Sequence, residues 1–211
     1  MMLSAGLFTS CTEKDNTVEE FADWQSKNET YWNKLYTATQ QKIKSGDTSW
    51  KIILNYTFQN QKQTSGSALT YSPENYIIAH VEQAGTGTTS PLYSDSVSMH
   101  YMGRLIPSTT YTSGLIFDKS WSNDTFNATT SRPAHSYLGL TYNAEGKAVS
   151  LVDGFTTALM SMHRGDHWTV YIPHQLGYGT SASGTVPAYS TLIFDLRLVD
   201  FSHPGTKLKD S

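Results

Sequence analysis

Residues 149–179 read VSLVDGFTTALMSMHRGDHWTVYIPHQLGYG, a stretch that predicts a short buried helix, a tight turn and a strand. Apolar side chains recur at the spacing of one helix face: Phe155, Ala158, Leu159 and Met162. Asp153 stands just before them, where its carboxylate would cap the helix. Gly165 follows where a left-handed helix C-terminus is expected.

The residues after this turn change to a two-residue period, which is typical of a strand. Trp168, Val170 and Ile172 fall on one face of it, and His167, Thr169 and Tyr171 on the other. Pro173 ends the predicted strand, because proline cannot donate to a β-ladder.

Composition excludes several classes of function. The length of 211 residues suits one domain with an appendage, and the net charge is −3. The chain has no run of lysine or arginine residues that would indicate nucleic-acid binding. No apolar run has the length of a membrane-spanning helix. Cys11 is the single cysteine, so no intramolecular disulfide forms. His163 and His167 are four residues apart, but Gly165 between them ends the helix that would bring them together. No cluster of His, Cys or Asp residues has the spacing of metal ligands, so no metal site is predicted.

The N-terminal part predicts one helix and two strands. Residues 18–44 have helical periodicity with one aromatic-rich face: Phe21, Trp24, Tyr31, Trp32, Leu35 and Ala38. We expect this face to dock on the domain, because burial of apolar surface is the main stabilising contribution, although a partner protein could also cover it. Alternation predicts a strand over 50–58, and a second strand is expected over 76–83.

Further strands are expected on both sides of the opening stretch. Val97, Met99 and Tyr101 share one strand face, residues 121–133 are a polar loop, and residues 136–140 are extended. Residues 141–148 are expected to form a turn. Alternation over 192–199 predicts a terminal strand, followed by a tail from residue 203.

Roughly residues 80–201 resemble the FKBP-type peptidyl-prolyl isomerases through a series of motifs in the family's order. These motifs are VSMHYMG (97–103), FDKS (117–120), LVDGF (151–155), MHRG (162–165), IPHQLGYG (172–179), and VP (186–187) followed by TLIFD (191–195). The resemblance implies an α+β fold, a twisted antiparallel sheet wrapped around one short helix, here preceded by an N-terminal helical segment. The expected divisions are a leader and tether (1–17), a helix and strand extension (18–75), the isomerase domain (76–201) and a tail (202–211).

The resemblance also implies a substrate site that needs no cofactor and no metal. Phe155 forms its floor in place of the family's frequent tryptophan. Tyr101, Phe117, Leu151, Val152, Val186 and Phe194 form the apolar walls. Tyr178 donates its hydroxyl to a substrate carbonyl, and Asp118 polarises the substrate or orients Tyr101. By pattern alone, these apolar residues would simply be core. Ala134 stands where the family often has an aromatic wall, and the loop 180–185 is short and polar, so we expect a modest isomerase.

Residues 7–11, LFTSC, resemble a bacterial lipobox, in which a signal peptide is cut before the cysteine and the thiol receives lipid. Cys11 is therefore the expected lipidation site, and the expected location is the bacterial cell envelope, periplasmic or surface-exposed. The alternative is an unmodified cysteine in an ordinary terminal segment.

The expected function is peptidyl-prolyl cis-trans isomerisation that assists protein folding outside the cytoplasm. Proline-containing polypeptides are the expected clients, and FK506-like macrolide inhibitors are implied by the resemblance. Two alternatives remain open. One is a non-catalytic chaperone of the same fold. The other is a surface glycan-binding lipoprotein, which abundant tyrosine and tryptophan and the Asn/Thr-rich loops favour; it predicts an exposed aromatic platform.

Overall fold

The computed structural model describes residues 19–59, 61 and 69–208. The helices are α1 (Trp24–Lys44), α2 (Tyr56–Gln59) and α3 (Asp153–Leu159), with 3-10 turns η1 (Pro73–Asn75) and η2 (His174–Leu176). The strands are β1 (Trp50–Leu54), β2 (Tyr76–Gln83), β3 (Ser96–Leu105), β4 (Ile116–Lys119), β5 (Ala134–Tyr137), β6 (Thr141–Tyr142), β7 (Ala148–Val149), β8 (His167–Ile172) and β9 (Leu192–Ser202).

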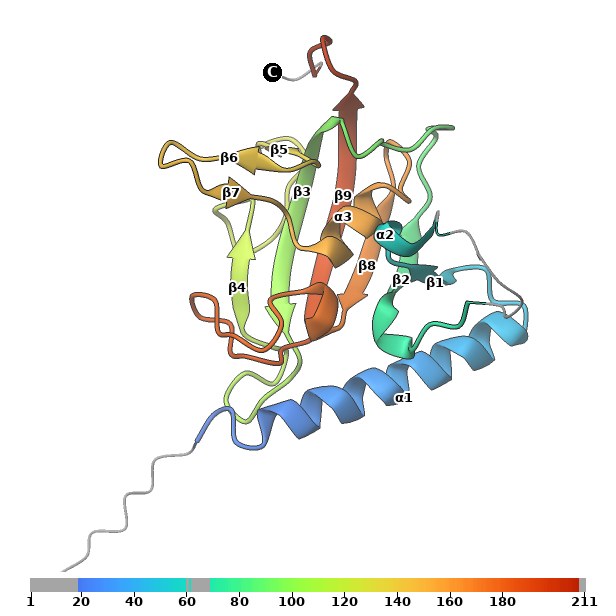
Figure 1. Cartoon of the computed structure of the whole chain (residues 1–211), viewed down its shortest axis with the longest axis vertical. Coiled ribbons are helices and arrows are strands. Elements are labelled where there is room, and N and C mark those ends of the chain that lie inside the picture. The colour runs from blue at the N-terminus through green and yellow to red at the C-terminus, as the bar shows by residue number, and fades with distance from the viewer. Residues whose placement is uncertain (1–18, 60, 62–68, 209–211) are drawn as a thin grey trace, which may run out of the picture.

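Seven strands form one antiparallel sheet in the order β1-β2-β8-β9-β3-β4, and β5 pairs with the other end of β3. The short helix α3 packs against β1, β2 and β8, and Figure 1 shows it lying across one face of the sheet. The core lies between them and includes Phe155, Leu159, Ile172 and Leu196. This is the predicted α+β fold, in which a sheet wraps around one short helix.

Helix α1 lies along one end of the sheet in Figure 1, and its aromatic face is docked as expected. Trp24 and Trp32 are buried, while Phe21 and Tyr31 pack against the core. Two hydrogen bonds fix the helix: Trp24 Nε1 donates to Ser190 Oγ at 2.8 Å, and Thr191 N donates to Asn28 Oδ1 at 2.7 Å. The helix begins at Trp24, later than predicted, because residues 20–23 form a turn in which Asp23 adopts φ 53°.

The strand predicted over 50–58 is wrong beyond Leu54. Asn55 is buried, and its side-chain Oδ1 accepts hydrogen bonds from Thr57 N and from Thr157 Oγ1, a residue far along the chain. These bonds turn the backbone into α2. The aromatic rings that suggested a strand instead stack on partners from other segments, Tyr56 on Tyr93 and Phe58 on Tyr71.

The helix-turn-strand stretch is confirmed with three changes. Val152 occupies the N-cap, so the predicted capping role of Asp153 is wrong; Asp153 is the first helical residue. The helix ends at Leu159, and Met162 is buried beyond its end. Gly165 adopts the expected left-handed φ of 87°, but in a turn where its N–H donates to Leu198 O at 2.8 Å.

Two shorter segments also differ from the sequence patterns. The extended segment expected over 136–140 is the strand β5, which begins and ends earlier because it pairs with Ser96–Met99 of β3. The turn expected over 141–148 is a small hairpin, since β6 pairs with β7. The terminal strand β9 is confirmed and continues to Ser202.

Candidate active site

A cavity of about 260 Å³ opens between the N-terminal end of α3, strands β3, β4, β5 and β9, and the segment after η2. Its lining residues are Met99, Tyr101, Phe117, Asp118, Ala134, His135, Ser136, Ser150, Leu151, Val152, Phe155, Tyr178 and Phe194. Residues far apart in the chain thus meet in one mostly apolar hollow.

Four aromatic rings pack edge to face beneath and beside this cavity. Phe155, on α3, is 4% exposed, and its ring centroid lies 4.8 Å from that of Phe194 and 5.8 Å from that of Tyr101. Phe117 stands on β4 at 5.6 Å from Phe194, with the planes at 88°. Such edge-to-face contacts fix ring orientations. The aromatic surface is therefore preformed.

Gly103 makes room for this aromatic cluster. It lies on β3 and pairs with Asp118 of β4 on one side and with Phe194 of β9 on the other. A Cβ at this position would stand 2.5 Å from the Phe117 ring and 2.7 Å from the Phe194 ring, closer than real Cβ contacts. Any larger residue would therefore push the two rings apart.

The polar groups of the cavity include a carboxylate and two phenols. Tyr101 donates its hydroxyl to Asp118 Oδ2 at 2.8 Å. Burial raises the pKa of Tyr101 far above its usual 10.0, and the hydrogen bond and charge of Asp118 add to the shift. Burial also raises the pKa of Tyr178, again with a contribution from Asp118. Both phenols therefore remain protonated donors at neutral pH.

Tyr178 is held in place by the backbone around it. Gly179 N donates to His174 O at 2.8 Å, and Tyr189 N donates to Gly179 O at 2.9 Å. Gly179 adopts φ 71°, a left-handed conformation that glycine accepts without steric cost. Tyr178 is 40% exposed and lines the cavity.

The structure brings eight of the predicted site residues together: Tyr101, Phe117, Asp118, Leu151, Val152, Phe155, Tyr178 and Phe194. Val186 does not line the cavity. It is 3% exposed in the core, where a tight turn directs it inward: Val186 N donates to Ser183 O and Ser183 N to Val186 O. Cys11 lies outside the described residues.

Sequence reasoning missed four lining residues: Met99, His135, Ser136 and Ser150. Met99 has a signal, since it alternates with Tyr101 on the same strand face. His135 and Ser136 of β5 have none, because their place depends on the pairing of β5 with β3. Ala134, where a larger wall was expected, leaves this side of the cavity lined by a methyl group.

Neither a candidate metal site nor a membrane-spanning helix is found in the described part of the chain. Within residues 19–59, 61 and 69–208, no group of three or more His, Cys, Asp or Glu side chains is arranged to hold a metal ion. None of the helices in those residues has the length and apolarity needed to cross a membrane.

Comparison with known proteins agrees with this geometry. The profile of the FKBP-type peptidyl-prolyl cis-trans isomerases matches residues 87–199. The macrophage infectivity potentiator of Trypanosoma cruzi is 30% identical over 70% of this chain and 63% of its own length. The peptidyl-prolyl cis-trans isomerase Mip of Coxiella burnetii is 33% identical over 59% of this chain and 44% of its own length. The chain thus spans less than two thirds of either relative.

A solved structure shares the fold. The peptidyl-prolyl cis-trans isomerase of Pseudomonas syringae superposes with a TM-score of 0.52 at 20% identity, covering 89% of this chain and 99% of that one. The profile match covers more than half of the chain and includes every lining residue of the cavity, from Met99 to Phe194. The chain therefore belongs to the family of FKBP-type peptidyl-prolyl cis-trans isomerases.

Proposed function

We propose that the protein catalyses cis-trans isomerisation of X–Pro bonds in polypeptides. The observation that carries this proposal is the aromatic cavity of about 260 Å³ with the Asp118–Tyr101 pair and Tyr178 in its lining. A proline ring is small and apolar, and it suits a preformed aromatic hollow that is open on one side. Family membership supports the same reaction.

Catalysis of this reaction requires only that the site binds the twisted amide more tightly than either planar isomer. Rotation about the amide bond has a barrier of about 18–20 kcal/mol, because resonance is lost in the twisted state. In that state the carbonyl is less polar than in either planar isomer, so a site poor in water favours it. A thousandfold acceleration requires about 4 kcal/mol of such preference. No bond is made or broken, and the reaction requires no nucleophile or cofactor.

The polar residues then have distinct roles. Tyr178 donates its hydroxyl to the carbonyl of the bound segment and holds it in register with the cavity. Asp118 accepts the hydrogen bond of Tyr101 and so orients that ring as a wall. Phe155 lies under the proline ring between Tyr101 and Phe194. Tyr178 and Phe155 are expected to touch the substrate, whereas Asp118 acts largely as a positioning residue.

Exchange between the cis and trans forms of a Phe-Pro peptide, measured by NMR, tests the proposal. The full chain is expected to accelerate exchange, Phe155→Ala to lose most of the acceleration, and Tyr178→Phe and Asp118→Ala to lose about three- to tenfold, the effect of one hydrogen bond. Tyr142→Phe, on an exposed tyrosine of β6, is the matched control. Acceleration that is absent, or equal in all variants, would contradict the proposal.

An isomerase-inactive chaperone is the second candidate, and the methyl-lined wall at Ala134 is the observation that favours it. In that case the peptide binds without faster exchange, and an FK506-like macrolide competes with the peptide for the cavity. The glycan-binding alternative has less support from the tryptophans than from the tyrosines. Trp24, Trp32, Trp121 and Trp168 are each less than 10% exposed and offer no platform for a sugar ring, whereas Trp50 is half-buried and several tyrosines are exposed.

We also propose that the protein assists folding in a bacterial cell envelope, anchored through lipid on Cys11. The lipobox-like residues 7–11 support this proposal. Expression in a bacterial host, followed by membrane fractionation and mass spectrometry of the N-terminal peptide, tests it. Acyl chains on Cys11, and release of the Cys11→Ser variant from the membrane fraction, are expected. An unmodified thiol in the wild type would overturn the assignment.

A further inference from the structure

The aromatic cavity extends further along strand β3 than its aromatic rings do. At one end, Gly103 of β3 pairs with Asp118 of β4 and with Phe194 of β9, and both partners line the cavity. At the other end, Met99 of β3 pairs with Ala134 of β5, and these two residues also line the cavity. Residues 99 and 103 of one strand are about 13 Å apart. The cavity thus has a β4 end and a β5 end.

The two ends present different side chains. The rings of Phe155, Phe194 and Tyr101 contact one another, so the aromatic floor lies beside residues 101–103 of β3. Ala134 and Ser136 share one face of β5 at the other end, and both are small and half-buried; His135 between them is exposed. The β5 end is therefore bounded largely by a methyl group, a hydroxyl group and the Met99 thioether.

A proline ring on the aromatic floor would leave the β5 end of the cavity unfilled. Met99 is one two-residue step from Tyr101, which is about 7 Å along the strand. Neighbouring residues of an extended polypeptide are about 3.3 Å apart, and a long side chain covers the remaining distance. The β5 end is therefore within reach of a large side chain on a residue next to the proline, whereas a small side chain would leave apolar surface in water.

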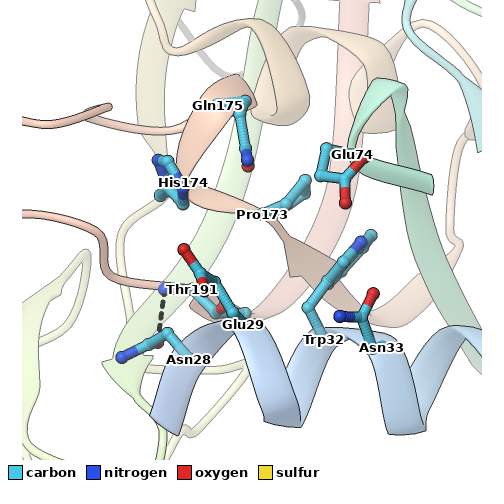
Figure 2. A pocket seen from close by; sticks show the side chains of 9 residues that line it. All are labelled: Asn28, Glu29, Trp32, Asn33, Glu74, Pro173, His174, Gln175 and Thr191. Atoms are coloured by element: carbon cyan, nitrogen blue, oxygen red, sulfur yellow. Dashed lines mark hydrogen bonds between the residues drawn. The ribbon is translucent and has the colours of Figure 1, made fainter. Parts of the chain in front are cut away.

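A separate pocket of about 190 Å³ between α1, η1 and η2 does not offer the same surface. It shares no lining residue with the aromatic cavity. Figure 2 shows Glu29 and Asn33 of α1 and Glu74 of η1 around it. An apolar ring placed there would take water from two carboxylates, which is unfavourable. The β5 end of the cavity is the better place for an apolar side chain of the same client.

An aromatic side chain with a polar edge suits the β5 end. The thioether of Met99 makes favourable contacts with aromatic rings. Ser136 Oγ donates to Tyr137 O at 3.3 Å, so its lone pairs can accept a hydrogen bond from a ligand. The indole N–H of tryptophan and the hydroxyl of tyrosine are donors of this kind. None of the described residues that line the cavity is a lysine or arginine, so an acidic side chain has no cationic partner there.

We propose that the β5 end of the cavity is a subsite for a tryptophan or tyrosine side chain next to the bound proline, and that Ala134 determines this selectivity. The inference rests on the proposed function, because that function places the proline on the aromatic floor. The ring lies against Met99 and Ala134, and its polar edge donates to Ser136. A large residue at position 134 would occupy the subsite itself and exclude the client's ring.

Cis-trans exchange of three capped peptides, measured by NMR with the full chain, tests the subsite. Ala-Trp-Pro-Ala and Ala-Ala-Pro-Trp place tryptophan before or after the proline, and Ala-Ala-Pro-Ala is the reference. One of the tryptophan peptides is expected to have about tenfold higher kcat/KM than the reference, because its ring is buried in the cavity. Equal kcat/KM for all three would overturn the subsite and leave the isomerase function intact. If no peptide is accelerated, the isomerase function fails, and equal dissociation constants would then overturn the subsite as well.

Ala134→Phe tests the selectivity residue. The ratio of kcat/KM for the preferred tryptophan peptide to that for the reference is expected to fall from about ten to about one, because the new ring fills the subsite. Ala84→Phe, on an exposed alanine outside the cavity, is the matched control and keeps the wild-type ratio. Intermolecular NOEs between the peptide indole and the methyl groups of Ala134 and Met99 in the wild type do not depend on the folding of any variant. Absence of these NOEs in the bound peptide, or an unchanged ratio in Ala134→Phe, would overturn the proposal.

Discussion

Phe155 shows how one side chain carries both stability and the proposed activity. It fills the space between α3 and the sheet, is 4% exposed, and contacts the rings of Tyr101 and Phe194 that line the cavity. A family-typical tryptophan would extend further into the same space. The smaller ring still closes the floor, because Phe194 packs against it at 4.8 Å.

Phe155→Ala is therefore expected to lower the free energy of unfolding by about 3–5 kcal/mol, the cost of emptying a buried aromatic site. Urea denaturation followed by tryptophan fluorescence measures this change. Phe155→Leu retains most of the apolar volume and is the comparison variant. A loss below 1 kcal/mol in Phe155→Ala would show that the ring is not part of the core packing described above.

Gly103→Ala is expected to separate the rings of Phe117 and Phe194, because the new Cβ would lie within 2.7 Å of both. Overpacking of this kind costs about 1–3 kcal/mol. Since both rings line the cavity, the exchange rate of the Phe-Pro peptide should fall in the same variant. Wild-type thermal stability together with a wild-type exchange rate would contradict this account.

Most single residues of the cavity could be predicted from the sequence, because the motifs specify residue types in a fixed order. Phe117, Asp118 and Tyr178 are examples, and all three line the cavity. Val186 could not be placed in this way. Its direction depends on the backbone bridge to Ser183, which its own apolar character does not reveal.

At the scale of elements, α1 is coupled to the loop that leads into β9. Thr191, the residue before β9, donates its backbone N–H to Asn28, which is 1% exposed. Ser190 accepts from the Trp24 indole and donates to Pro187 O at 2.7 Å. Glu20, just before the helix, accepts from Ser108 Oγ and from Thr110 N, and these bonds lower its pKa to about 2.

Asn28→Ala is expected to destabilise the protein by about 1–3 kcal/mol, since it leaves the Thr191 N–H buried without an acceptor. Asn33→Ala, on an exposed asparagine of the same helix, is the matched control and should change stability by less than about 0.5 kcal/mol. Equal stability losses in the two variants would mean that the hydrogen bond to Thr191 contributes nothing specific. Amide hydrogen exchange of Thr191 provides an independent measurement.

Periodicity identified the long elements and misjudged those whose ends depend on distant partners. The alternation in β8 and β9 reflects one buried face, and both strands were predicted correctly. The end of β1 could not be predicted, because Asn55 is held by Thr157 from α3. The pocket between α1, η1 and η2 was also beyond sequence reasoning, since its walls come from four separate segments.

For the molecule as a whole, tyrosine ionisation is expected to lower stability at alkaline pH. Burial raises the pKa of six tyrosines: Tyr31, Tyr36, Tyr56, Tyr101, Tyr171 and Tyr178. For Tyr31 the value is about 12. In the unfolded chain these groups ionise near pH 10. Above that pH the unfolded state loses protons that the folded state retains, so folding becomes less favourable as pH rises.

The tyrosine contribution to the free energy of unfolding is therefore expected to be constant below about pH 9. The free energy of unfolding is expected to fall as the pH rises from 10 toward 12. Urea unfolding at several pH values measures the slope, and phenolate absorbance measures ionisation. Tyr31→Phe should reduce the slope, whereas Tyr142→Phe, on an exposed tyrosine, should not. A slope unchanged by Tyr31→Phe would contradict the assigned cause.

The position of β2 determines how short a working fragment can be. The family profile begins at residue 87, yet β2 lies between β1 and β8, and its Ile77, Ile78 and Ala79 are fully buried. A polypeptide trimmed to 87–199 would lack β1 and β2, and β8 would become an apolar edge strand with unpaired backbone N–H and C=O groups. Such an edge can pair with strands of neighbouring molecules and cause aggregation. Recombinant material for crystallography or screening should therefore retain α1, β1 and β2, even when only the aromatic cavity is of interest.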